Sequence, residues 1–165
     1  MRQDIWVAIG ANLASPRGLS PIETAREAVA ELDSLPVLDL LGLSCWYESA
    51  PIPASDQPSY INAVAHLRGE IDPVDFLGIL QEIERVAGRR RGVINAARPL
   101  DLDIIAVGDL VRIQPDLILP HPRAHLRAFV LLPLADVAPN WVHPVSFRTV
   151  DDLIADLPAQ TIRRL

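Results

Sequence analysis

Residues 100–105 read Leu-Asp-Leu-Asp-Ile-Ile, which places two carboxylates two positions apart in an apolar run. Side chains alternate between the faces of an extended strand, so Asp101 and Asp103 project to one face, about 7 Å apart, while Leu100, Leu102 and Ile104 project to the other. The run therefore predicts a strand with one core face and one acidic face. Two carboxylates on a half-buried face repel each other unless a cation lies between them, and a divalent metal ion is the economical choice.

The alternative for this segment is an ordinary amphipathic strand whose polar face meets water, because such alternation is common in half-exposed sheets. Two observations favour a functional site. Asp is depleted in strands, and departures from local propensity are expected where function requires them. Arg98, just upstream, supplies the positive charge that a phosphate group attracts.

Length and composition predict one compact domain spanning residues 1–165. Half of the residues are hydrophobic, and the sequence contains no Gly/Ser-rich or charged linker. No segment approaches the roughly 20 apolar residues that a membrane-spanning helix needs, and Met1 leads directly into a strand-like run. We therefore expect a cytoplasmic protein without a membrane partner. Cys45 is the single cysteine, so it cannot form an internal disulfide.

The charge inventory excludes several phosphate-handling mechanisms. All 15 basic side chains are arginines, and the chain contains no lysine. A Walker A loop, a protein-kinase site and Schiff-base chemistry each require a lysine, so all three are excluded. The net charge of −6 argues against broad nucleic-acid binding. Any phosphate site must therefore be local and built from arginine and metal.

Helix and strand signals occur in a definite order. Ser20, Pro21 and Glu23 combine a helix cap, a proline at the first helical position and an acidic residue three positions after the cap, and Asp72 with Pro73 opens a second helix in the same way. Strands are predicted at residues 5–9, 37–47, 60–67 and 100–107, with a short extended segment at 110–113 and C-terminal helices at 129–137 and 150–157. The β-α-β-β-α-β order predicts an α+β fold with a ferredoxin-like antiparallel sheet, on which the helices pack.

Four ordered segments resemble the landmark segments of 6-hydroxymethyl-7,8-dihydropterin pyrophosphokinases. They are residues 8–13 (AIGANL), 56–63 (DQPSYINA), 98–105 (RPLDLDII) and 120–130 (PHPRAHLRAFV). The resemblance implies an ATP-dependent enzyme of folate biosynthesis that moves pyrophosphate from ATP onto the pterin hydroxymethyl oxygen and releases AMP. It also implies a monomer that acts on two small-molecule substrates and binds no nucleic acid.

On the ATP side, the resemblance makes Asp101 and Asp103 the ligands of two Mg²⁺ ions. This agrees with the residues, since Mg²⁺ is commonly held by one or two carboxylates together with waters and phosphate oxygens. The implied catalytic residues are Arg89, Arg98, Asp101 and Asp103. The implied ATP contacts are Gln81, Glu84, Arg89, Arg91, Arg98, Ile104, His121 and Arg127. From the residues alone, Gln81 and Glu84 would suit an exposed polar helix face nearly as well, and His121 an ordinary loop.

On the pterin side, the implied residues are aromatic and amide side chains and a proline-rich loop. A flat heteroaromatic ring needs an aromatic partner for stacking and amide groups that match its donor and acceptor edge. The implied contacts are Ala50, Pro51, Pro53, Tyr60, Asn62 and Phe129. From the sequence alone, Phe129 would equally suit the core, whereas an amide inside a strand must find partners.

One segment departs from the family pattern. Residues 94–97 read Ile-Asn-Ala-Ala, where relatives have Trp-Gly-Pro after a basic residue. Because the resemblance implies a mobile lid there, the change is expected to weaken nucleotide binding or slow closure. Two alternatives stay open: a catalytically impaired relative that binds pterin or nucleotide, which this departure suggests, and an RNA-binding ferredoxin-like module, which the fold and the basic residues 89–91 suggest. The second is disfavoured, because Asp101 and Asp103 would repel a phosphate backbone and aromatic platform residues are missing.

Overall fold

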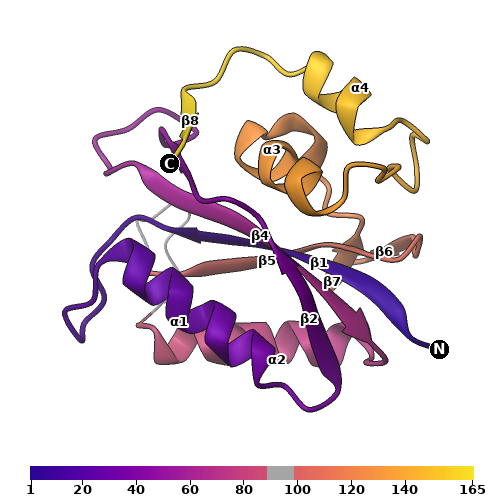
Figure 1. Cartoon of the computed structure of the whole chain (residues 1–165), viewed down its shortest axis with the longest axis horizontal. Helices are drawn as coiled ribbons and strands as arrows, with labels where there is room; N and C mark the ends of the chain where they lie inside the picture. The colour runs from indigo at the N-terminus through magenta and orange to yellow at the C-terminus, as the bar shows by residue number, and fades with distance from the viewer. Residues whose placement is uncertain (89–98) are drawn as a thin grey trace.

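An antiparallel sheet with helices on both faces forms the centre of the computed structural model, which describes residues 1–88 and 99–165 (Figure 1). The sheet strands are β1 (Gln3–Ala11), β2 (Leu38–Leu43), β3 (Tyr47–Ser49), β4 (Tyr60–Gly69), β5 (Asp101–Val107) and β8 (Ile162–Arg164). The helices are α1 (Pro21–Asp33), α2 (Pro73–Val86), α3 (Ala128–Val137) and α4 (Val150–Ala155), with a 3₁₀ turn at Ala124–Leu126. A separate hairpin joins β6 (Arg112–Gln114) to β7 (Leu117–Leu119).

Strand pairing sets the geometry of the molecule. The sheet order is β5-β1-β4-β3-β8, and β2 also pairs with β4. Because β1 lies between β4 and β5, Gly10 is opposite both Asn62 and Asp101, and Ala8 is opposite Asp103. Residues that are far apart in the sequence thus meet at the end of β1.

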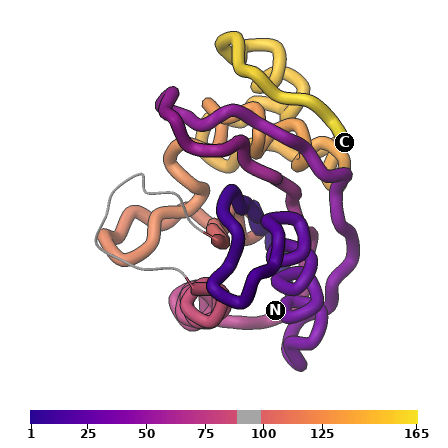
Figure 2. Tube along the Cα trace, turned by 90° about the vertical axis from the view of Figure 1, so that its left-hand side faces the viewer, coloured from indigo at the N-terminus to yellow at the C-terminus, as the bar shows by residue number. Residues whose placement is uncertain are grey.

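Two helical layers cover the sheet. Ile5, Val7 and Ile9 of β1 belong to the core cluster under α1 and α2, whereas Trp6 and Ala8 pack against the cluster built by α3 and α4. Figure 2 shows the same separation after a quarter turn, with α3, α4 and the C-terminal segment (orange to yellow) on the face opposite α1 and α2. No helix in the described ranges is both long enough and apolar enough to cross a membrane.

The helix starts agree with the sequence signals. Ser20 and Glu23 form a reciprocal capping box at α1, and Asp72 accepts hydrogen bonds from the backbone N–H groups of Val74 and Asp75 at α2. Each cap satisfies amide groups that the first helical turn leaves without a partner. The predicted C-terminal helices also form, and α3 continues through Pro133.

The strand predicted at 37–47 is wrong as a single element. It divides into β2 and β3, because β2 pairs with the C-terminal half of β4 and β3 with the N-terminal half. Between them, the Ser44 hydroxyl accepts the Val64 N–H at 2.9 Å, and within β2 the register shifts between Leu40 and Gly42. The break depends on this partner strand, which alternation within the segment does not reveal.

Candidate active site

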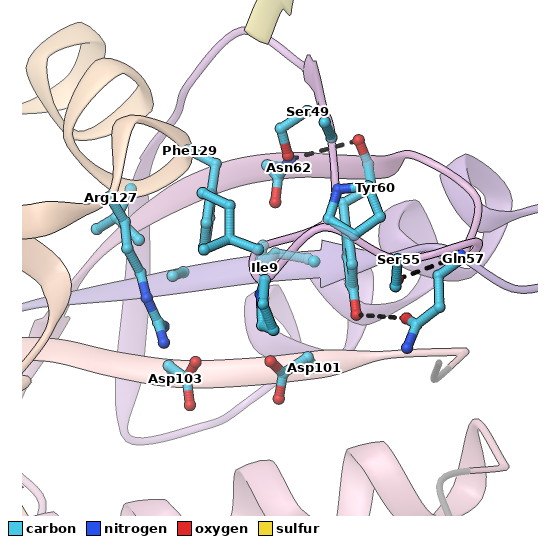
Figure 3. Close-up of a pocket in the computed structure, with 17 residues that line it drawn as sticks. Ile9, Ser49, Ser55, Gln57, Tyr60, Asn62, Asp101, Asp103, Arg127 and Phe129 are labelled. Atoms are coloured by element: carbon cyan, nitrogen blue, oxygen red, sulfur yellow. Dashed lines mark hydrogen bonds between the residues drawn. The ribbon is translucent and has the colours of Figure 1, made fainter. Parts of the chain in front are cut away.

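A cavity of about 150 Å³ opens on the α3 face of the sheet, where β1 ends and β4 and β5 begin (Figure 3). Its sides are the sheet, the loop at residues 50–57 and the start of α3. The residues that line it are Ala8, Ile9, Gly10, Ser49, Ala50, Pro51, Ile52, Pro53, Ser55, Gln57, Tyr60, Asn62, Asp101, Asp103, Arg127, Phe129 and Val130. All six predicted pterin contacts are among them, together with both aspartates.

Asp101 and Asp103 project into the cavity from the same face of β5 (Figure 3). Leu102 and Ile104 are each only 3% exposed and belong to the core on the opposite face. The prediction of one core face and one acidic face is therefore confirmed. Paired carboxylates at an open cavity suit a hard divalent cation that takes its remaining ligands from water and phosphate oxygens, so this donor set fits Mg²⁺.

His121 lies beside this pair. Its Nε2 is 4.0 Å from Asp103 Oδ2, and its backbone N–H donates to Ile105 O at 2.8 Å, which fixes the loop to β5. Its Nδ1 accepts the Arg123 N–H at 3.1 Å, so the proton of the neutral ring belongs on Nε2. Burial and the nearby Arg127 guanidinium lower the pKa of His121 to about 4, against the opposing effect of Asp101. The ring is thus a neutral donor at physiological pH.

Arg127 occupies the junction between the 3₁₀ turn and α3. It is the residue that immediately precedes the helix, and its guanidinium lies 5.4 Å from the centre of the Phe129 ring. In Figure 3 its side chain extends from the α3 end of the cavity toward Asp103. The arginine therefore brings positive charge to the acidic side of the cavity, while Phe129 presents an aromatic surface.

The other side of the cavity combines amide and aromatic groups. Asn62 is 3% exposed, and its Nδ2 donates to Ser49 Oγ at 2.7 Å. Asn12 Nδ2 donates to Gln57 Oε1 at 3.1 Å and to Pro58 O at 3.3 Å, which ties the proline-rich loop to the end of β1. The Tyr60 hydroxyl is 3.5 Å from Gln57 Oε1. These contacts fix the orientation of polar groups that could match the edge of a flat heterocycle.

Four predicted ATP contacts lie outside the cavity lining. His121 borders it through Asp103, as described above. Gln81 and Glu84 lie on α2, and Glu84 is not on an exposed helix face: it is 2% exposed, and its Oε2 accepts the Leu102 N–H at 2.8 Å. The Ile104 side chain is in the core, which leaves its backbone as the part that could contact a ligand. Arg89, Arg91, Arg98 and the segment 94–97 lie outside the described residues.

Four polar residues of the site were not predicted: Asn12, Ser49, Ser55 and Gln57. Asn12 and Gln57 lie inside two of the landmark segments, so a search for polar side chains there would have found them. Ser49 and Ser55 lie outside these segments and carry no comparable signal. The role of Ser49 becomes visible only through the pairing of β3 with β4, which brings it to Asn62.

Several known proteins are similar to this chain in sequence, and solved structures are similar to it in fold. The family model described as 7,8-dihydro-6-hydroxymethylpterin-pyrophosphokinase (HPPK) matches residues 6–139. The 2-amino-4-hydroxy-6-hydroxymethyldihydropteridine pyrophosphokinase of Pseudomonas aeruginosa is 40% identical over 165 residues, covering 100% of this chain and 98% of that protein. The Haemophilus influenzae protein of the same name is 36% identical over 141 residues, covering 86% of this chain and 85% of that protein.

The fold is also similar to a crystal structure of Plasmodium falciparum HPPK-DHPS with pteroate. The TM-score is 0.71, and the match covers 94% of this chain and 42% of the longer one. At 13% sequence identity, this similarity concerns the fold alone.

Proposed function

This chain belongs to the 7,8-dihydro-6-hydroxymethylpterin-pyrophosphokinase family. From that premise we propose which part of its cavity binds the pterin and which part binds ATP. The enzyme transfers pyrophosphate from ATP to 6-hydroxymethyl-7,8-dihydropterin in folate biosynthesis, which yields the pterin diphosphate and AMP. The observation that carries the proposal is the pairing of Gly10 with both Asn62 and Asp101. Two strand spacings, about 10 Å, then separate the amide side from the acidic side. A bicyclic ring with a hydroxymethyl arm can bridge that gap.

The pterin ring is proposed to lie between the aromatic and amide groups of the inner cavity. Tyr60 and Phe129 would contact the ring, and the Asn62 amide would read its hydrogen-bonding edge. Support for this comes from the buried Asn62–Ser49 hydrogen bond, which limits the amide to one orientation. The backbone at Ala50, Pro51 and Pro53 would complete the wall.

The ATP phosphates are proposed to lie over β5. Asp101 and Asp103 would hold two Mg²⁺ ions, which when bound neutralise phosphate charge and favour in-line attack at phosphorus. Arg127 would contact a phosphate group, and His121 would donate a hydrogen bond from Nε2–H to a phosphate oxygen. Gln81, Glu84, Ile104, Arg89, Arg91 and Arg98 complete the proposed ATP contacts. Arg89 and Arg98 join the aspartates as the proposed catalytic residues.

The family membership does not favour an RNA-binding module or an impaired relative. We propose that the core is ferredoxin-like, which the order β5-β1-β4-β2 of its main strands supports, and that the enzyme is a monomer.

The test is an assay for AMP. The protein is incubated with ATP, Mg²⁺ and 6-hydroxymethyl-7,8-dihydropterin, and AMP is quantified with and without the pterin. The proposal requires pterin-dependent AMP in equal amount to the pterin diphosphate. Folded protein that forms no AMP above the pterin-free background would contradict it.

A further inference from the structure

A C-terminal segment, residues 158–164, contacts two walls of the cavity although the family model match ends at residue 139. It follows α4 and ends in β8, which lies beside β3 (Figure 1). None of its residues lines the cavity. The segment therefore contacts the walls of the cavity without being placed to contact a substrate, and the proposed function gives these contacts no role.

Gln160 binds the backbone on both sides of Arg127. Its Oε1 accepts the Ala128 N–H at 2.9 Å, and its Nε2 donates to Leu126 O at 3.0 Å. The oxygen and the nitrogen of one side-chain amide thus each hydrogen-bond to a residue next to Arg127. A side-chain amide can satisfy one backbone donor and one backbone acceptor in this way without strain on either.

The local backbone explains why such a contact matters. Arg127 is the single residue between the 3₁₀ turn and α3, with an extended conformation (φ −118°, ψ 114°). Its own side chain makes no capping hydrogen bond to α3. The Ala128 N–H belongs to the first helical turn, where backbone donors lack partners within the helix, and Gln160 supplies one from elsewhere in the chain. A rotation about Arg127 would break one or both of these bonds.

The next residue fixes the other wall. Thr161 O accepts the Ala50 N–H at 3.0 Å, and Ile162 pairs with Ser49 in the β3–β8 ladder. Consecutive residues of one segment therefore hold the start of α3 and the β3 end of the proline-rich loop. This fixes Gln160 in place relative to the cavity.

We propose that Gln160 is a positioning residue of the pyrophosphokinase reaction, one that aims the Arg127 guanidinium into the cavity by bonding the backbone at Leu126 and Ala128. The proposal rests on the proposed function of the cavity. Gln160 touches neither substrate. It acts through Arg127, and positional errors near a reacting group are costly because catalysis of phosphoryl transfer is mainly positioning and charge stabilisation.

The main variant is Gln160→Met, which keeps the length of the side chain and removes both hydrogen bonds. We expect kcat/KM for the pterin to fall by roughly tenfold, the scale set by two ordinary hydrogen bonds. Gln160→Glu keeps an acceptor for the Ala128 N–H and is expected to retain more activity than Gln160→Met. The matched control is Arg163→Met on β8, which removes the exposed ion pair with Glu48 and should leave kcat/KM within about twofold of the wild type.

A double-mutant cycle with Arg127→Ala separates positioning from general stability. If Gln160 acts through Arg127, Gln160→Met should change kcat/KM less than about twofold once Arg127 is alanine. An undiminished tenfold loss in the Arg127→Ala background would overturn the proposal, and so would near-wild-type kcat/KM in folded Gln160→Met. A wild-type protein that forms no AMP would instead reject the proposed function itself.

Discussion

At the scale of single residues, the two aspartates of β5 carry the largest expected effect on the reaction. Their common face follows from strand alternation, and their surroundings bring His121 and Arg127 to the same side of the cavity. The pattern alone could predict the acidic face, because alternation is a local property of the backbone. It could not predict His121 beside Asp103, since that contact depends on the hydrogen bond from the His121 N–H to Ile105 O.

Asp101→Asn and Asp103→Asn should each lower kcat by on the order of 100-fold or more, because each removes a negative charge that is proposed to hold a cation at the phosphates. Steady-state kinetics at increasing Mg²⁺ concentration measures this, and the apparent Mg²⁺ requirement should rise. Asp109→Asn, on the exposed turn after β5, is the matched control. Near-normal turnover of Asp103→Asn at saturating Mg²⁺ would show that its metal-binding role is wrong.

Asn62→Ala should weaken pterin binding while leaving ATP binding nearly unchanged. The variant removes the amide that would hydrogen-bond to the ring, and the loss of such a bond costs about 1–3 kcal/mol, or roughly 5- to 150-fold in Kd. Pterin and ATP titrations by calorimetry give both affinities. Equal weakening of both ligands would argue for general damage to the cavity instead of recognition of the ring.

At the scale of elements, helix starts and strand pairing differ in how far the sequence could predict them. Caps at Ser20 and Asp72 are local, so the starts of α1 and α2 were predictable. The division of β2 from β3 and the addition of β8 depend on partners distant in the chain. The connection between α2 and β5 also depends on residues distant in the chain, because Glu84 accepts a hydrogen bond from the Leu102 N–H at the edge of β5 that does not pair with β1.

Glu84→Ala should destabilise the protein, because it leaves the Leu102 N–H buried without its carboxylate acceptor. The expected loss is about 1–3 kcal/mol, and each kcal/mol lowers Tm by roughly 2–4 °C in a chain of this size. Glu82→Ala is the matched control, since it removes an exposed ion pair with Arg85 on the same helix. Thermal unfolding followed by circular dichroism compares them. Equal Tm values for the two variants would show that the Glu84–Leu102 hydrogen bond does not stabilise the fold.

At the scale of the whole molecule, the register of β1 against its two neighbours creates the site. Asn62 and Asp101 are 39 positions apart in the chain, yet both are opposite Gly10. Neither periodicity nor local propensity predicts that register. Only the resemblance of the ordered landmark segments to a known family assigns the two residues to one site. Gln160 carried no such signal. Its role depends on the path by which the C-terminal segment returns across α3 to β3.

The opposite end of the sheet is expected to contribute acid-sensitive stability. Burial opposes ionisation of Asp4, but hydrogen bonds from His66 and Arg68 outweigh it and hold the pKa of Asp4 below its usual value. A lowered carboxyl pKa stabilises the fold above the unfolded-state pKa of about 3.9, and this contribution is lost as the pH falls through the folded-state pKa.

Asp4→Asn should therefore be less stable than the wild type at pH 7, by less than about 1 kcal/mol because the carboxylate is partly exposed. The difference should disappear in strong acid. Urea unfolding of both proteins at a series of pH values tests this, with Asp109→Asn as the control for loss of one negative charge. A difference in stability that stays constant down to the lowest pH would show that ionisation of Asp4 does not contribute to stability.

If the cavity transfers a pyrophosphoryl group as one unit, the β-phosphorus of ATP must end in the pterin product. The enzyme is incubated with Mg²⁺, 6-hydroxymethyl-7,8-dihydropterin and ATP labelled at the β-phosphate, and the products are separated. We expect the label in the pterin product and unlabelled AMP as the remaining nucleotide. Label retained in ADP, with a single phosphate on the pterin, would contradict transfer as one unit.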